Sequence, residues 1–166
     1  MSVGNVTAAM KKLNDVHLEM IAVGKEKQRA IIDNNSTNLT QLMSKENRLL
    51  RQMSELEQQR IEEVNSFLQD KGIRSQLNLS VTELVRLVFD SNEKEELMQV
   101  RDSLLNNALV LKRENELTTQ LLEQSLHFID FSLNIIVGVD NELIYKKPTD
   151  IPPSISNKNS FFDAKA

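Results

Sequence analysis

The sequence predicts an all-α fold, an elongated antiparallel helical hairpin or coiled-coil bundle with three long helices, one short helix and a disordered C-terminal tail. Three observations support it. Pro148, Pro152 and Pro153 are the only prolines, so the first 147 positions contain no obligate helix breaker. The same region is rich in Leu, Glu, Gln, Lys, Arg and Met, the strong helix formers. Strand signals are nearly missing, because no sustained polar/apolar alternation is bounded by Asn-Gly or Asp-Gly turns.

The first helix is predicted over about residues 5–33, where apolar residues recur mostly at spacings of three and four. The stripe consists of Val6, Ala9, Met10, Leu13, Val16, Met20, Ile21, Val23, Ala30 and Ile31. It is weak between Gly24 and Gln28. The polar run Asp33-Asn34-Asn35-Ser36 ends this helix, since short polar side chains favour turns and N-caps.

A second helix is predicted over about residues 36–71, and Gly72 suits the left-handed position that follows a helix end. Its stripe consists of Leu39, Leu42, Met43, Leu49, Leu50, Met53, Leu56, Val64, Phe67 and Leu68. The short turn between the first two helices predicts that they form an antiparallel hairpin.

Two capping signals predict the remaining helices. Ser80 and Glu83 fit a capping box that opens a short, almost wholly apolar helix over about residues 81–89, placed to close one end of the bundle. Asp90 then begins a run of capping residues before the long final helix, over about residues 91–138. This organisation gives a helical bundle over residues 1–139 and a flexible tail over residues 140–166, where Pro, Ser, Asn and Lys accumulate.

The lengths of the helices indicate a candidate surface. At about 1.5 Å per residue the three long helices span roughly 43, 54 and 70 Å, so the partner of the last helix runs out near His127. Seven of the next ten residues, 128–137, are large and apolar, whereas a helix end in water is expected to be polar. Two interpretations remain open. The short helix, the connector or a second copy covers this end, or it is an exposed platform for a partner.

Composition excludes several function classes. The chain has 20 Lys plus Arg against 24 Asp plus Glu, a net charge of −4 that disfavours nucleic-acid binding. There is no Cys, and no apolar run has the length of a signal peptide or a membrane span, so we expect a cytoplasmic protein without membrane insertion. Glu123, His127 and Asp130 share a helix face, but a second Glu-x-x-His motif is missing, so a salt-bridging face is preferred to a metal site. We expect no catalytic residue, cofactor or metal, and therefore no enzyme.

The helical body resembles the FlgN family, cytoplasmic export chaperones of the bacterial flagellar type III secretion system. The resemblance covers about residues 5–145. It rests on the end of the first helix, Ala30 to Asn35, and on the Leu42…Lys45-Glu46…Leu49-Leu50 stretch. The stronger feature is Asn115-Glu116…Leu121-Leu122…Ser125-Leu126-His127-Phe128-Ile129…Ser132-Leu133-Asn134-Ile135-Ile136, followed by a polar segment with Tyr145.

The resemblance implies binding of hook-associated (filament-junction) flagellar proteins through their C-terminal helices, and delivery to the flagellar export ATPase complex and gate. The residues expected to contact such a client are Leu122, Leu126, Phe128, Ile129, Phe131, Leu133, Ile135 and Ile136. The alternative is a coiled-coil adaptor or homodimeric module without a client. A chaperone is expected to be monomeric or weakly dimeric, whereas that module forms a stable dimer.

Overall fold

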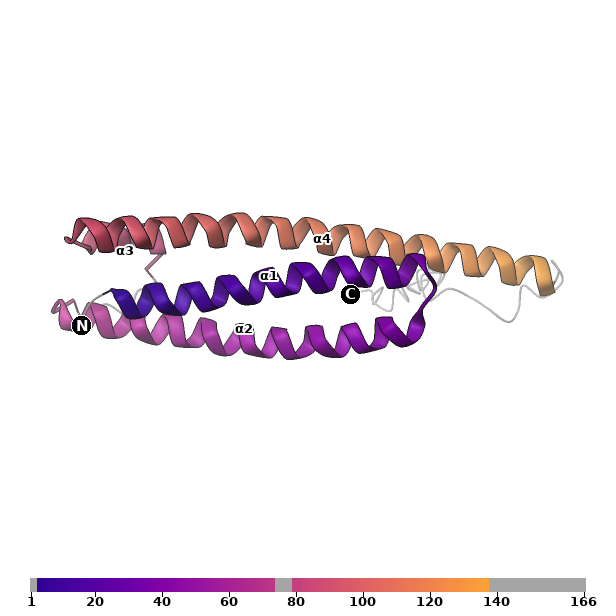
Figure 1. Cartoon of the computed structure of the whole chain (residues 1–166), viewed down its shortest axis with the longest axis horizontal. Helices are drawn as coiled ribbons and strands as arrows, with labels where there is room; N and C mark the ends of the chain where they lie inside the picture. The colour runs from indigo at the N-terminus through magenta and orange to yellow at the C-terminus, as the bar shows by residue number, and fades with distance from the viewer. Residues whose placement is uncertain (1–2, 74–78, 138–166) are drawn as a thin grey trace, which may run out of the picture. The chain divides into compact units, whose positions relative to one another are not determined.

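The computed structural model describes residues 3–73 and 79–137 and contains four helices (Figure 1). They are α1 (Gly4–Ile32), α2 (Ser36–Asp70), α3 (Val81–Leu87) and α4 (Ser91–Val137), and the described residues include no strand. Three helices are long, with 29, 35 and 47 residues, and α3 has 7. The predicted all-α fold with three long helices and one short helix is therefore confirmed. The predicted tail over residues 140–166 lies outside the described residues.

The chain divides into two compact units, Met1–Leu126 and His127–Ala166. Within the first unit α1 and α2 form the predicted hairpin, and their turn is made by two adjacent asparagines. Asn34 adopts a left-handed φ of 53°, and the N–H of Asn35 donates to the carbonyl of Ala30 at 2.9 Å. This pattern closes α1. The side chain of Asn35 then accepts from the N–H of Asn38 at 3.0 Å, which starts α2.

The end of α2 follows the prediction for Gly72. Its φ is 72°, and its N–H donates to the carbonyl of Gln69 at 2.9 Å. The N–H of Ile73 donates to the carbonyl of Leu68, also at 2.9 Å. These two hydrogen bonds satisfy carbonyl groups that the end of a helix leaves without partners. They form only when the residue after the helix, here Gly72, has a left-handed backbone.

The capping residues of α3 and α4 also behave as predicted. The Ser80 hydroxyl accepts from the N–H of Glu83, and the Glu83 carboxylate accepts from the N–H of Ser80 at 2.8 Å. The Asp90 carboxylate accepts from the N–H groups of the second and third residues of α4. By contrast α3 ends at Leu87 rather than at Phe89, because Val88 has an extended backbone with φ −88° and ψ 120°.

Two apolar clusters hold the first unit together. One joins all four helices around buried residues such as Met10, Leu68, Leu84 and Leu97. The short helix α3 contributes Leu84 and Val85 to it, as its apolar composition predicts. The second cluster lies mainly between α1 and α2, with Leu111 of α4 packed against it. All ten residues of the predicted α1 stripe are buried.

Some apolar residues of α2 and α4 are exposed instead of packed, including Met43 and Leu50 of the predicted α2 stripe. Met43 and Leu50 lie on the outside of α2, and Leu105 and Leu117 on the outside of α4. Met43, Leu50 and Leu105 directly follow a leucine that faces the interior, and successive residues of a helix point about 100° apart. Only one residue of such a pair can therefore enter the core.

Candidate functional site

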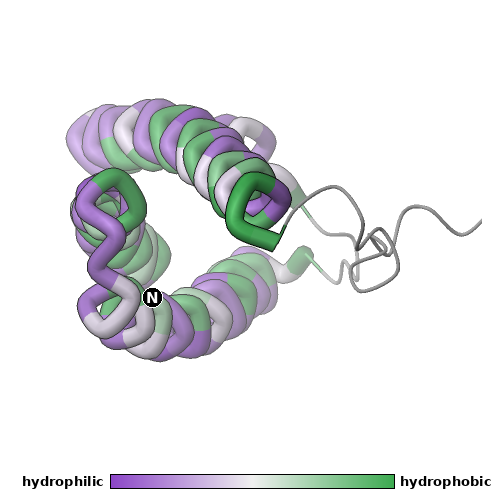
Figure 2. Tube along the Cα trace, turned by 90° about the vertical axis from the view of Figure 1, so that its right-hand side faces the viewer, coloured by the Kyte–Doolittle hydropathy of each residue, from purple (hydrophilic) through white to green (hydrophobic). Residues whose placement is uncertain are grey.

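The last turns of α4, in the unit His127–Ala166, expose large apolar side chains. Phe128 is 68 % exposed, Phe131 is 62 % exposed and Ile135 is 66 % exposed. The other exposed apolar residues of this stretch are Ile129, Leu133, Ile136 and Val137. Figure 2 shows these last turns mainly in the colour of hydrophobic residues. Among the described residues, none of the seven belongs to either core cluster.

The eight residues that the sequence singles out lie on one continuous helix. Leu122 and Leu126 are near the end of the unit Met1–Leu126. The other six lie in the second unit, namely Phe128, Ile129, Phe131, Leu133, Ile135 and Ile136. All eight side chains are exposed, between 43 % and 78 %. The structure thus places them on the surface of α4, available for contact with another molecule.

The sequence explains why α4 stays helical to Val137. Asp90 caps its first turn, and neither Gly nor Pro occurs between Ser91 and Val137. Leucine-rich stretches with spacings of three and four support the helix along its length. Gly138 follows directly. The apolar side chains near the end are therefore carried on a regular helix, which is a precise scaffold for a contact surface.

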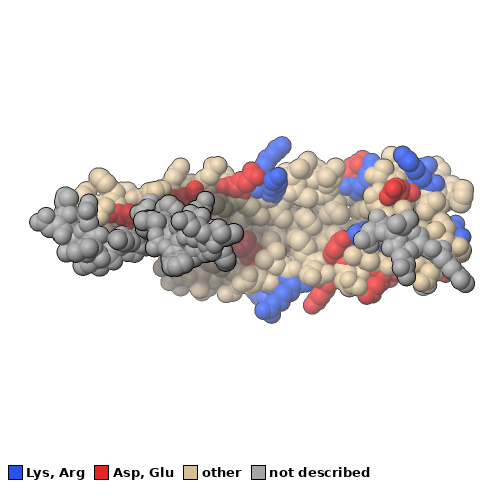
Figure 3. All heavy atoms as spheres, turned by 180° about the vertical axis from the view of Figure 1, so that it is seen from behind, with Lys and Arg blue, Asp and Glu red and all other residues tan. Residues whose placement is uncertain are grey.

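The polar groups of the described residues do not gather into a metal site. In the part of the chain that the structure describes, no three His, Cys, Asp or Glu side chains are placed to hold a metal ion. None of the described helices is long and apolar enough to cross a membrane. On the face shown in Figure 3, basic and acidic side chains are interspersed. The most prominent side chains of the α4 end are the exposed apolar ones.

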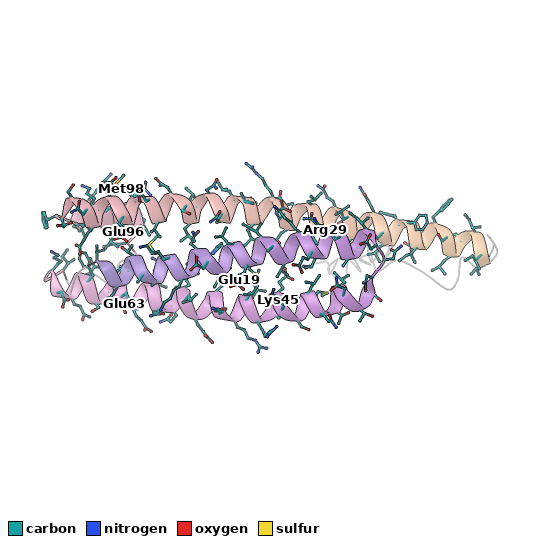
Figure 4. The ribbon with its side chains drawn as sticks, viewed as in Figure 1. Glu19, Arg29, Lys45, Glu63, Glu96 and Met98 are labelled. Atoms are coloured by element: carbon teal, nitrogen blue, oxygen red, sulfur yellow. The ribbon has the colours of Figure 1, made fainter. Side chains whose placement is uncertain are left out.

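Within the first unit, α4 is joined to α1 by polar contacts that periodicity does not reveal. Asn14 of α1 donates to the hydroxyl of Ser103 at 3.1 Å and accepts from the side-chain amide of Asn107 at 2.8 Å. Lys11 forms an ion pair with Glu96, which Figure 4 labels on the side of α4 that faces α1. These pairs show that α1 and α4 run parallel.

A second polar group lies further along the same two helices. The side-chain amide of Gln28 donates to the Glu114 carboxylate at 2.7 Å and lies 3.3 Å from the Thr118 hydroxyl oxygen. Thr118 is buried. Every residue of α4 is described by the structure, and only Leu97 and Val100 of this helix are buried as well. Gln28, at the end of the weak stretch of the α1 stripe, therefore makes a polar contact with α4.

Comparison with known proteins identifies the family. The model of the family described as FlgN protein matches residues 1–150. A protein of Bacillus subtilis (strain 168), named "Uncharacterized protein YvyG", is 28% identical to this chain over 166 residues, and the match covers 100% of both chains. No solved structure matches the chain. The chain belongs to the FlgN family, a family of flagellar export chaperones.

Proposed function

We propose that this chaperone binds hook-associated flagellar proteins through their C-terminal helices, using the exposed apolar side chains at the end of α4. Bound to the chaperone in the cytoplasm, such a client stays unassembled. The complex then delivers it to the flagellar export ATPase complex and gate. The family supplies the type of activity, and the α4 end supplies a surface for it.

One observation carries the proposal. Seven of the ten residues from Phe128 to Val137 are large, apolar and exposed. Exposing so much contiguous apolar surface on a helix is unfavourable in water, and such patches commonly mark sites of protein contact. An amphipathic helix from a client buries this kind of surface efficiently, since its apolar residues recur at the same spacings of three and four.

The test compares two double variants, each of which replaces two large, exposed apolar side chains of α4 with Ser. In Phe131→Ser/Ile135→Ser the two exposed residues lie four apart at the α4 end. In the control, Leu105→Ser/Leu109→Ser, they are also four apart on α4, exposed, and outside the eight candidate residues. Burying each side chain against a partner contributes roughly 1.5–3 kcal/mol. The first variant is therefore expected to bind a hook-associated protein at least about 100-fold more weakly.

Binding is measured by calorimetry against each purified hook-associated flagellar protein of the same bacterium, with melting temperature and helix content measured in parallel. Lost binding with unchanged melting, together with normal binding by the control, supports the proposal. A lower melting temperature with retained binding shows instead that Phe131 and Ile135 belong to the protein's own core. A stable dimer of the wild-type chain that binds none of these proteins favours the homodimeric module.

A further inference from the structure

Within the first unit, the contacts that α4 makes with the other helices change in character along its length. The α4 residues that face these helices recur at spacings of three and four and are buried or half-buried, namely Leu97, Val100, Leu104, Asn107, Leu111, Glu114 and Thr118. The first three are apolar and pack in or against the four-helix cluster. Three of the last four are polar, and the fourth, Leu111, packs against the second cluster. Apolar contacts therefore anchor the start of α4, and mainly polar contacts hold the stretch that follows.

The α1 side of this later stretch also contributes little apolar bulk. Asn14 and Gln28 make the hydrogen bonds to α4. Gly24, which has no side chain, lies opposite the Cβ of Glu114. An open cleft of about 390 Å³ runs along the same stretch, lined by His17 of α1 and by six residues of α4. Water therefore reaches into much of the contact between the two helices.

The hairpin of α1 and α2 is packed far more tightly than this contact. In α1, 12 of 29 residues are buried. In the stretch of α4 from residue 101 to residue 126, all of which the structure describes, Thr118 is the only buried residue. Burial of apolar side chains is the main favourable term in helix packing, whereas a hydrogen bond that replaces one to water gains little. Separating this stretch of α4 from α1 therefore costs less free energy than separating α1 from α2.

We infer that α4 separates from α1 as one local unit, from about Leu104 to Leu126, while its start and α3 stay in the four-helix cluster. The α1–α2 hairpin stays folded in this open state. The opening is a property of the fold and does not depend on the proposed function. It uncovers Leu111 and the part of the second cluster against which Leu111 packs. A partner that binds these uncovered side chains holds α4 open, because a ligand shifts an equilibrium towards the state that it binds better.

Two cysteine reporters on α4 measure the opening. The chain contains no Cys. Val100 and Thr118 are 9 % and 8 % exposed, so Val100→Cys and Thr118→Cys place two thiols of matched burial on the same helix. A thiol reagent reacts with a buried Cys only when the surrounding structure opens. After each rate is divided by that of the urea-unfolded chain, Thr118→Cys is expected to react at least about 10-fold faster than Val100→Cys. Equal rates overturn the inference.

Asn14→Ala tests whether the stretch opens as one unit. Asn14 accepts a hydrogen bond from Asn107, which lies roughly 17 Å along α4 from Thr118. If residues 104–126 open together, losing the contacts of Asn14 is expected to speed the reaction of Thr118→Cys by about fivefold and that of Val100→Cys by less than about twofold. An unchanged rate at position 118 shows that only the last turns of the unit fray, and it contradicts the inference.

A disulfide between α1 and α4 provides the converse test. A Cβ added at Gly24 would lie 3.8 Å from the Cβ of Glu114, which is the usual separation of the two Cβ atoms in a disulfide. Gly24→Cys/Glu114→Cys is therefore expected to form a bond that holds α4 against α1. In the reduced form, the amides of residues 107–126 are expected to exchange at least about 10-fold faster than those in the middle of α1, because the opened turns lose their tertiary support. Oxidation is expected to remove most of this difference.

The outcomes of the disulfide experiment bear on the inference alone. Equal protection of α1 and of residues 107–126 in the reduced form overturns it, and so does failure of the disulfide to form. Faster exchange in residues 107–126 that oxidation suppresses supports it. Circular dichroism and the melting temperature check that every variant is folded. None of these measurements uses a client, so the proposed function stands or falls separately.

Discussion

The side-chain amide of Gln28 in α1 donates a hydrogen bond to the carboxylate of Glu114 in α4, with 2.7 Å between the two atoms. The same nitrogen lies 3.3 Å from the Glu114 carbonyl oxygen and from the Thr118 hydroxyl oxygen. Polar residues at a helix interface fix the register of the helices, because sliding by one turn leaves their groups without partners. Gln28 and Glu114 thus set how α4 aligns with α1 in the first unit.

A double-mutant cycle measures this contact. We expect Gln28→Ala and Glu114→Ala to be coupled by about 1.5 kcal/mol in the free energy of unfolding, the low end of the roughly 1.5–3 kcal/mol that hydrogen bonds to charged groups contribute, because this pair is only partly buried. The control cycle uses Gln58 and Glu62, an exposed amide–carboxylate pair within α2 at 3.0 Å. Its coupling is expected to be about 0.2–0.5 kcal/mol. Equal coupling in both cycles would contradict a register role for Gln28.

Two glycines should respond in opposite directions to alanine. Gly72 has a φ of 72°, so Gly72→Ala is expected to destabilise the fold by roughly 1–2 kcal/mol. Gly24 lies inside α1, and an added Cβ would meet only the Cβ of Glu114, at the ordinary distance of 3.8 Å. Gly24→Ala is therefore expected to stabilise the fold by up to about 1 kcal/mol. Urea unfolding measures both changes, and two changes of the same sign would show that the backbone argument is wrong.

The α3 capping box should make this helix sensitive to acid. Hydrogen bonds from the Ser80 hydroxyl and the Ser80 N–H lower the pKa of Glu83 from its ordinary value of 4.5. A lowered folded-state pKa means that the stabilisation is present above the unfolded value and is lost as pH falls through the folded value. The protection factors of the α3 amides against hydrogen exchange are therefore expected to fall below about pH 4.5.

An NMR titration of the Glu83 carboxyl carbon measures the pKa directly. Ser80→Ala removes the hydroxyl donor and is expected to move the pKa of Glu83 back towards 4.5. Glu83→Gln serves as the control, since it has no titrating group and should abolish the acid sensitivity of α3. An unchanged pKa in Ser80→Ala would show that the hydroxyl contributes nothing.

The cluster that joins four helices should depend strongly on Leu84. This side chain is 0% exposed, so Leu84→Ala is expected to lower the free energy of unfolding by about 2–5 kcal/mol. Phe89→Ala is the comparison, because Phe89 is 87% exposed. The Lys71 ammonium lies over its ring, 5.3 Å from the ring centroid. The cost of Phe89→Ala is expected to be below about 1 kcal/mol. Chemical denaturation of both variants gives the comparison, and similar costs would mean that α3 is not part of the core.

Local signals in the sequence identify most helix ends. Ser80 and Glu83 form their capping box, Asp90 caps α4, and Gly72 takes the left-handed position, because each signal acts within a few residues. Phe89 is the exception. The helical pattern includes it, but the chain becomes extended at Val88, which is buried in the four-helix cluster. The helix therefore ends two residues earlier than its sequence pattern predicts, at the point where Val88 packs into this cluster.

The candidate surface can also be found from the sequence, because exposed apolar residues at a helix end conflict with the usual pattern. The exposure of Phe131 and Ile135 agrees with that expectation, and their role in binding stays a prediction. Adjacent apolar residues are harder to assign. Leu49 is buried and Leu50 is exposed, and only the positions of neighbouring helices decide which of two such residues packs inward.

The sequence by itself determined the helical class, the asparagine turn and most caps, since these depend on residues close together in the chain. Only the tertiary structure decided that Gln28, Glu114 and Thr118 meet, and that Asn14 lies between Ser103 and Asn107. Periodicity assigns polar residues to the outside. The partners of Gln28 and Asn14 are more than 80 positions away, so their contacts exist only after α4 has packed along α1.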